Sequence, residues 1–359
     1  MFDFRNSHKG LLITFITLIL ASLLMFSLAG CGGQKPSAEQ KEKAPAEKIT
    51  LRFPGTLPLE HHITKAQEMF KKLVEERTNG QVTIEIYPAG QLYTDKDLVD
   101  VVPRGGVEMA EVNTGMWTGL VPELGLFDIM SYYENPQHVY RCQDDPEIRA
   151  VMEKSLEQKA NVKLIGWLAY TGRGPLTVKP VEKMEDWKGL KIRAHSEWCS
   201  YWLKALGASP IVMSSAEVYQ ALQRKTIDGV ISGGTSYVQR KLYETAKYGV
   251  GNISLAEGIF AIMMNKNTWA KLPKDVQDVL LQAAKETTVW CRQEAQKQEE
   301  ESWKQLAAMP DFHVVKLSDQ EIKRWQKATV APQQEIFSNR VGKDVAEKLY
   351  ARVEALREK

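Results

Sequence analysis

Two hydrophobic periods alternate along the first third of the chain and predict strands and helices in turn. Residues 49–53 and 82–87 alternate apolar and polar side chains, as half-buried strands do, and residues 107–113 form a third predicted strand. Between the first two strands, residues 61–78 carry apolar side chains on one face, and Gly80 follows this predicted helix as a stop. Strands that alternate with helices at this spacing indicate a parallel sheet with helices on its faces.

The rest of the chain continues the alternation and ends in helices. Residues 162–167 and 258–265 are strand-like, with shorter strands and helices between them. Residues 273–309 begin with a proline and are rich in Ala, Gln, Lys and Glu, so they predict one long helix. Two further helices are expected over residues 318–337 and 341–356.

One arginine stands at the end of a short predicted strand. Residues 191–193 read Lys-Ile-Arg, and a Gly-Leu pair turns the chain into them. A guanidinium at a strand tip is a planar fork of donors that suits a carboxylate. Taken alone, Arg193 is more simply interpreted as a surface arginine or as half of a structural ion pair.

The motifs around Arg193 carry a resemblance to a known family. Residues 188–193, 206–210, 217–223 and 227–229 hold a Lys-Gly-Leu-Lys-x-Arg strand, a Leu-Gly-Ala-x-Pro turn, a Glu-Val-Tyr-x-Ala-Leu-Gln helix and an Asp-Gly strand start, in that order. This string resembles the substrate-binding proteins of TRAP transporters, the DctP-like family of periplasmic solute receptors. Further similar segments extend the resemblance from residue 49 nearly to the C-terminus; they are residues 53–70, 87–92 and 265–273.

The resemblance implies a fold and a division of the chain. The expected fold is α/β and two-lobed, like other periplasmic binding proteins, with mixed sheets flanked by helices and a long helix over residues 273–309 that spans both lobes. Lobe I is expected to comprise residues 49–170 and 258–297, and lobe II residues 171–257 and 298–359. A length of 359 residues is sufficient for two hydrophobic cores.

The resemblance also implies that the lobes close on an organic acid. Arg193 would bind its carboxylate, and Arg173, which lies between two glycines, would add a second positive contact; a structural role for Arg173 stays equally open. Ser232 stands where relatives carry an asparagine, so it offers a shorter hydroxyl. Gly233 and Gly234 follow it, and with the many aromatic residues they favour a larger or aromatic monocarboxylate over a small dicarboxylate.

Four weaker candidates complete the predicted site. Ser215 belongs to a capping box at a helix N-terminus, where anions are stabilised, although a cap needs no ligand. Trp117 follows a strand and either walls the pocket or packs in the core. Tyr237 is a possible pocket wall, and Thr56 lies in the loop after the first strand, where α/β sheets place ligands.

The first residues predict export and a lipid anchor. Residues 1–30 have a weakly basic start and an apolar run typical of a signal peptide. Leu28-Ala29-Gly30-Cys31 resembles a lipobox, in which Cys31 is acylated after cleavage; an uncleaved membrane anchor is the alternative. Residues 31–48 are expected to form a flexible tether. Either way the folded body lies outside the cytoplasmic membrane, in the periplasm or its extracytoplasmic equivalent.

Composition narrows the function classes. The net charge is +2, from 47 basic and 45 acidic residues, which gives no field that would favour nucleic acid. The cysteines beyond the leader show no metal-ligand spacing, and no cofactor or metal is expected; they are expected to be buried free thiols, with one disulfide left open (Cys142, Cys199 and Cys291).

The resulting functional prediction is a receptor that delivers an organic acid to a TRAP permease and performs no chemistry. The chain has no Gly-x-Ser-x-Gly elbow, His-Glu-x-x-His motif or phosphate loop that would indicate an enzyme. The alternatives are a receptor of another transporter class, a surface-anchored enzyme, or a structural lipoprotein.

Overall fold

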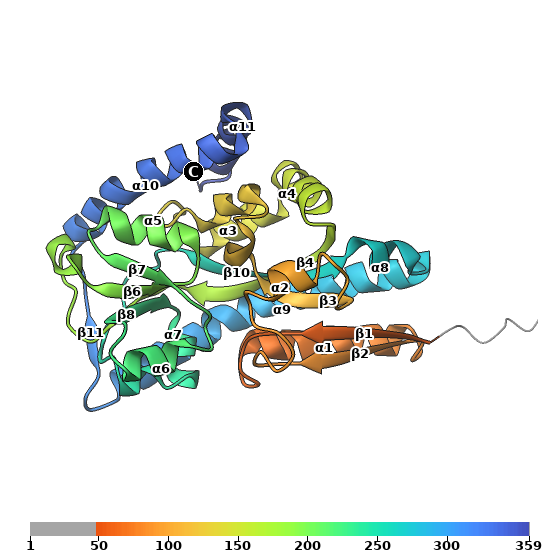
Figure 1. Cartoon of the computed structure of the whole chain (residues 1–359), viewed down its shortest axis with the longest axis horizontal. Helices are drawn as coiled ribbons and strands as arrows, with labels where there is room; N and C mark the ends of the chain where they lie inside the picture. Colours follow the sequence, from red (N-terminus) through yellow and green to blue (C-terminus); the bar gives the residue numbers. More distant parts are fainter. Residues whose placement is uncertain (1–47, 359) are drawn as a thin grey trace, which may run out of the picture. The chain divides into compact units, whose positions relative to one another are not determined.

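The computed structural model describes residues 48–358. At the start of this part, β1 (Ile49–Pro54) pairs in parallel with β2 (Val82–Tyr87), and α1 (His62–Arg77) connects them (Figure 1). The side chain of His61 caps α1 by accepting a hydrogen bond from the backbone N–H of Ile63 at 3.2 Å. The alternating pattern therefore predicted this unit correctly.

A three-stranded sheet lies beside β1 and is antiparallel. Its central strand is β10 (Glu257–Asn265), with β3 (Met109–Asn113) on one side and β4 (Val162–Gly172) on the other. Arg52 of β1 donates its backbone N–H and its guanidinium to Glu108, just before β3. The parallel pairing that the alternation of strands and helices indicated holds for β1 and β2. It does not extend to β3, because β10 pairs with β3 from a segment far along the chain, and the sheets are mixed as expected.

A second, six-stranded sheet is mixed. Strands β6, β7 and β8 are mutually parallel, as are β9 and β11, whereas β5 runs antiparallel to both of its neighbours. Across the sheet the strands are β11 (His313–Val315), β9 (Tyr248–Val250), β5 (Gly174–Thr177), β8 (Gly229–Ser232), β6 (Lys191–Ala194) and β7 (Ser209–Val212).

The chain passes between the two groups of strands at Arg173. β4 ends at Gly172 in one sheet, and β5 begins at Gly174 in the other. Backbone hydrogen bonds join Arg173 to Leu255 and Ala256, at 2.7 and 2.9 Å, just before β10 returns to the first group. Two strand connections therefore run side by side where the sheets meet.

One long helix packs against both groups of strands. α9 (Lys274–Ala307) has 34 residues, close to the predicted range of 273–309, and contacts α1, β4 and α7 (Gly234–Gln239) (Figure 1). Thr288 of α9 donates to the backbone of Trp167 in β4. The α/β architecture with mixed sheets and a shared helix is thus as expected, while the exact division into lobes stays a prediction.

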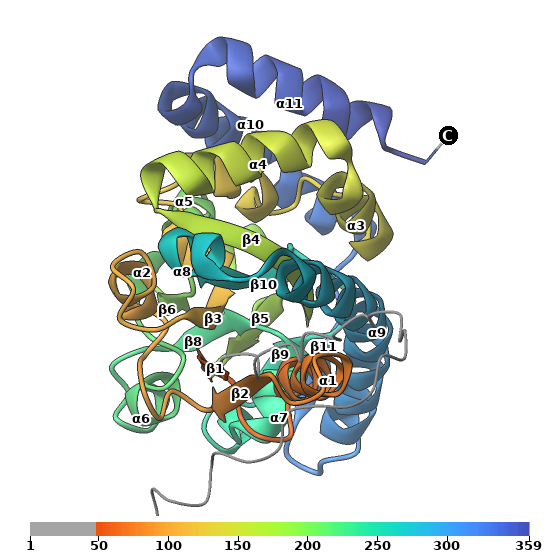
Figure 2. The ribbon, with the colours of Figure 1, turned by 90° about the vertical axis from the view of Figure 1, so that its right-hand side faces the viewer.

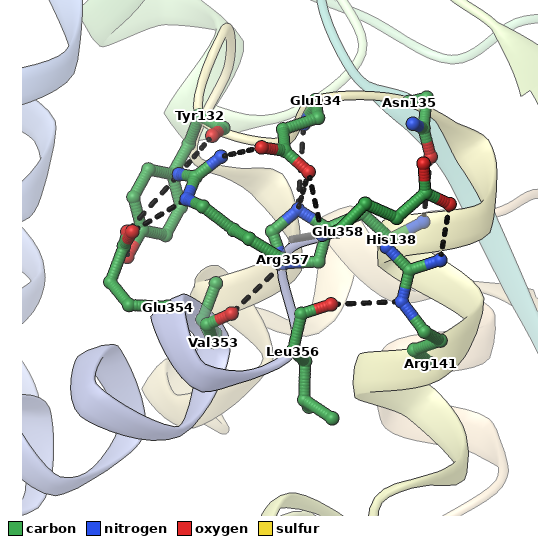
Figure 3. Close-up of polar contacts among 10 residues, drawn as sticks. All are labelled: Tyr132, Glu134, Asn135, His138, Arg141, Val353, Glu354, Leu356, Arg357 and Glu358. Atoms are coloured by element: carbon green, nitrogen blue, oxygen red, sulfur yellow. Dashed lines mark hydrogen bonds and ion pairs between the residues drawn. The ribbon is translucent and has the colours of Figure 1, made fainter.

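Two C-terminal helices, α10 (Asp319–Val341) and α11 (Lys343–Ala355), pack on the side of α3 (Pro136–Asp144) and α4 (Pro146–Lys159) (Figure 2). Polar contacts at the start of α3 secure the end of α11 (Figure 3). There Arg357 donates to the backbone O of Tyr132 and to Glu354, and Arg141 donates to the backbone O of Leu356 at 2.8 Å. These contacts tie the chain end to the first group of strands, although residues 298–359 were predicted as part of lobe II.

The remaining elements connect and cover the sheets. They are α2 (Leu98–Val101), α3 (Pro136–Asp144), α4 (Pro146–Lys159), α5 (Glu197–Ala205), α6 (Val218–Gln223), α8 (Lys266–Lys271) and the 3-10 helices η1 (Thr114–Trp117), η2 (Pro122–Asp128), η3 (Met184–Trp187) and η4 (Leu242–Glu244).

The three predicted thiols are free and buried, as expected: Cys142, Cys199 and Cys291. Within residues 48–358 no helix is long and apolar enough to cross a membrane, and no group of three or more His, Cys, Asp or Glu side chains is arranged for a metal ion. Cys31, the leader and the tether lie outside the described residues, except for Lys48.

The docking of α11 generates a stability prediction. Leu349→Ala should destabilise the protein by about 2–5 kcal/mol, because this leucine is 2% exposed and a cavity would remain in the core. Val345→Ala, on the same helix but 37% exposed, should change stability by less than about 0.5 kcal/mol. Urea unfolding followed by tryptophan fluorescence measures both; equal effects of the two variants would contradict the docking.

Candidate functional site

A cavity lies between the loops of the two groups of strands. The first group contributes Leu57, Asp95 and Tyr170 to its lining, and the six-stranded sheet and its helices contribute Arg193 and Arg240, among others. The cavity holds about 450 Å³ not filled by protein atoms, including the part open to solvent. Its lining combines apolar walls with several charged and hydroxyl groups, as ligand sites do.

Arg193 supplies a buried cation, and no carboxylate of the described residues forms an ion pair with it. It is the third residue of β6, with β7 and β8 on either side, and its side chain is 3% exposed. Nε and Nη2 both donate to the backbone O of Met213 at 3.1 Å, and Arg193 makes no ion pair within 4.0 Å in residues 48–358. Burial lowers the pKa of Arg193, and the charge of Asp95 partly opposes this effect. The predicted strand-tip position of Arg193 is confirmed.

Arg173 also lines the cavity, but its charge is already matched. Its Nη1 forms an ion pair with Asp128 at 3.3 Å and a short hydrogen bond with Nε2 of His195. Burial acts to raise the pKa of Asp128, yet His195 and Arg173 outweigh it and hold this pKa at about 2. Burial, reinforced by the charge of Arg173, lowers the pKa of His195 to about 4, so this ring is neutral at pH 7.

Arg240 is a third cavity arginine, and the sequence analysis missed it. It follows α7 directly, and its Nη2 donates to the backbone O of Thr56 at 3.1 Å and to Oγ of Ser215 at 3.3 Å. Burial lowers its pKa, and it makes no ion pair within 4.0 Å among the described residues. Gln239 donates to the backbone O of Glu60 at 3.2 Å, so α7 reaches the loop after β1 at two points.

Hydroxyl groups line another part of the cavity. Oγ of Ser232, at the end of β8, lies 2.9 Å from the hydroxyl of Tyr170, and that hydroxyl also forms a short hydrogen bond with Ser236. Tyr170 was missed because the predicted strand stopped at residue 167, whereas β4 continues to Gly172. An aromatic residue next to the flanking glycines of Arg173 was the available signal.

Four of the seven candidate ligand residues line this cavity, namely Arg193, Arg173, Ser232 and Ser215. Trp117 is fully buried in the core around η1 and is not part of the lining. Tyr237 is also fully buried, and its hydroxyl hydrogen-bonds to the backbone of Gly174 and Ser232, so it braces β5 and β8 behind the cavity. Thr56 contributes its backbone, as an acceptor for Arg240.

Residues 53–340 match the family described as bacterial extracellular solute-binding protein, family 7, or DctP. The chain belongs to this family. The recognition made from the motifs around Arg193 is therefore confirmed, and so is the two-lobed fold shared by TRAP periplasmic solute-binding proteins.

Individual relatives in family 7 cover most of the chain. The C4-dicarboxylate-binding periplasmic protein DctP of Rhodobacter capsulatus is 29% identical over 308 residues, which is 83% of this chain and 89% of the relative. A sugar acid binding protein of Advenella mimigardefordensis, in complex with galactonate, has a TM-score of 0.81 at 23% identity and covers 87% of this chain and 100% of its own. A TRAP solute-binding protein of Sulfurospirillum deleyianum with bound succinate has a TM-score of 0.77 at 27% identity, over 85% of this chain and 99% of its own. These relatives are solute-binding receptors rather than enzymes.

A buried carboxyl group of this family 7 protein lies against the loop after β1. Glu111, in β3, is fully buried and accepts a hydrogen bond from the backbone N–H of Thr56 at 2.7 Å. Burial raises the pKa of Glu111 to about 8; the bond from Thr56 opposes this effect, and the charge of Asp95 adds to it. The carboxyl is therefore neutral at pH 7.

Glu111 predicts a pH dependence of stability. The folded carboxyl keeps its proton up to about pH 8, whereas an unfolded glutamate loses it near 4.5, so unfolding releases a proton between these values and stability falls as pH rises. Through this carboxyl the free energy of unfolding should fall by up to about 2.7 kcal/mol between pH 5.5 and 7.5, and Glu111→Gln should remove that part of the fall.

Urea unfolding of both proteins at the two pH values measures the difference. Glu68→Gln, an exposed change on α1, is the control and should keep the pH dependence of the unsubstituted protein. An unchanged pH dependence in Glu111→Gln would show that this carboxyl is ionised in the fold.

Proposed function

We propose that this protein is the receptor of a TRAP-type secondary transporter and that it holds an organic acid by a contact between Arg193 and the ligand's carboxylate. The observation that carries the proposal is a guanidinium that is 3% exposed and has no ion pair among the described residues. Burying an unpaired charge is costly, and an anionic ligand removes that cost. Relatives named for C4-dicarboxylates, or solved with galactonate or succinate, support an organic acid as the ligand class.

The donors left on Arg193 fit a paired contact. Nη1 has no hydrogen bond to the described protein, and Nη2 uses one of its two protons for Met213. Both terminal nitrogens therefore retain a proton for a carboxylate, and two parallel charge-assisted bonds fix its orientation. Arg173 positions the site instead, because Asp128 and His195 already occupy its charge.

Hydrogen bonds between the two groups of strands support a mechanism by closure. Arg240 bonds to Thr56, Gln239 bonds to Glu60, and Oδ2 of Asp95 accepts from the backbone N–H of Ser215 at 3.5 Å. A ligand that contacts both sides favours this closed arrangement, and the TRAP permease would recognise it. The moving parts in this proposal are the predicted lobes, residues 49–170 with 258–297 and residues 171–257 with 298–359.

The proposal places the receptor outside the cytoplasmic membrane and anchors it there. The family is extracellular, and the leader predicts cleavage before Cys31 and lipidation of its thiol. The 31–48 segment would then act as the tether that lets the receptor reach its permease.

The carboxylate contact is tested by Arg193→Ala. The substitution should weaken binding by about 3–5 kcal/mol, which is more than a hundredfold, because the acid would be buried without its partner. Calorimetric titration with the first acid found to raise the melting temperature measures the loss. Arg224→Ala, an exposed arginine after α6, is the matched control and should bind normally. A folded Arg193→Ala protein that binds within tenfold of normal refutes the contact.

The anchor is tested by Cys31→Ser expressed from the full sequence. The unsubstituted protein should sediment with membranes and incorporate labelled palmitate, whereas the variant should lose the label. Cys142→Ser, which changes a buried thiol of the folded body, should keep the label. Label on the Cys31→Ser protein would contradict lipidation at this position.

A further inference from the structure

Asp95 places an unpartnered carboxylate oxygen in the wall of the cavity. The residue is 4% exposed and lines the cavity. Oδ2 accepts from the backbone N–H of Ser215, but Oδ1 is buried and has no hydrogen-bonding partner in residues 48–358. Asp95 forms no ion pair within 4.0 Å with either Arg193 or Arg240 in that part of the chain. A buried acceptor without a donor is costly, so the site is complete only when something donates to Oδ1.

One loop brings Asp95 close to the cations of the site. The backbone O of Met213 holds Arg193, and two residues later Ser215 binds both Asp95 and Arg240. An acid whose carboxylate binds Arg193 therefore extends among side chains that include the negatively charged Asp95. A second carboxylate there would meet Asp95, and like charges brought together in a buried site repel each other strongly.

The charge balance of the lining favours a ligand with one negative charge. Arg173 is matched by Asp128, and the neutral His195 adds no charge. The charged groups left on the lining are Arg193, Arg240 and Asp95, which together carry one net positive charge. One negative charge on the ligand balances the cavity.

We infer that Asp95 is the specificity-determining residue of the site and that it selects monocarboxylates carrying a hydroxyl or N–H donor over dicarboxylates of the same size. The inference rests on the proposed function, because it needs the ligand's acid group on Arg193. A site built to accept a hydrogen bond strongly rejects an analogue that lacks the donor. The carboxylate of Asp95 adds repulsion against an analogue that replaces the donor with an anion.

A different role for Asp95 makes a different prediction. If Asp95 served only to hold the two sides together through Ser215, its loss would weaken all ligands alike. Selection between a donor and an anion, in contrast, must change the ratio of two affinities. Matched acid pairs measure this ratio directly.

The experiment titrates the full receptor by calorimetry with pairs that differ in one terminal group. The pairs are 4-hydroxybutyrate and succinate, galactonate and galactarate, and 3-hydroxybenzoate and isophthalate. In at least one pair the hydroxy acid should bind at least tenfold more tightly than the diacid. Asp95→Asn should reduce that ratio at least tenfold, because the amide removes the negative charge. Asp100→Asn, an exposed aspartate paired with Arg104 on the surface, should leave the ratio unchanged.

The outcomes separate this inference from the proposed function. A hydroxy acid that gains less than tenfold over its diacid in every pair that binds, or equal weakening of both acids by Asp95→Asn, overturns the role of Asp95 and leaves the proposed receptor function unaffected. Binding that survives Arg193→Ala, or no binding by any acid, overturns the proposed function and the inference with it. If Asp95→Asn fails to fold, the ratio in the unsubstituted protein can still overturn the inference, because Asp95 cannot select hydroxy acids if no pair shows the preference.

Discussion

The site depends on a guanidinium that is removed from water and left without an ion pair. Arg193 is positioned by β6 at the middle of three parallel strands, and the carbonyl of Met213 fixes its plane through two donors. The carbonyl of Met213 accepts hydrogen bonds but does not neutralise the charge of Arg193, so an anion that enters the cavity would be stabilised there. The ordered plane of the fork means that little entropy is lost when a carboxylate meets it.

The neighbouring arginine, Arg173, is already paired within the protein and therefore does not compete with Arg193 for an anion. Arg173 lies where β4 passes into β5, and its ion pair with Asp128 and its bond to His195 join this crossing to η2 and to the end of β6. With Arg173 paired, Arg193 and Arg240 are the lining arginines without an ion pair in the described chain, and in the proposed function Arg193 is the one that binds the carboxylate. The same contacts fix the geometry of the crossing between the two groups of strands.

Local patterns in the sequence predicted what depends on local structure. The β1, α1 and β2 unit, the long α9 and the strand of Arg193 all follow from periodicity and motif. The antiparallel pairing of β10 could not be predicted from local patterns, because its partners β3 and β4 are distant in the chain. For the same reason the sequence did not place Asp95 or Arg240 at the site: the pattern around Asp95 indicated only a helix cap, and the two residues share a partner only when loops from both groups of strands meet at Ser215.

In the proposed mechanism, the forces that hold the two sides together make closure sensitive to the ligand. The hydrogen bonds of Arg240, Gln239 and Asp95 across the cavity each stabilise the closed form by about 0.5–1.5 kcal/mol. Against them, closure buries two guanidinium groups, Arg193 and Arg240, that lack an ion pair in the described chain, and burial lowers the pKa of each. Asp95 offsets one of these charges, so the other opposes closure until an anion enters. A ligand that supplies this charge would remove the opposition, and in the proposed mechanism the closed shape then reports that the site is filled.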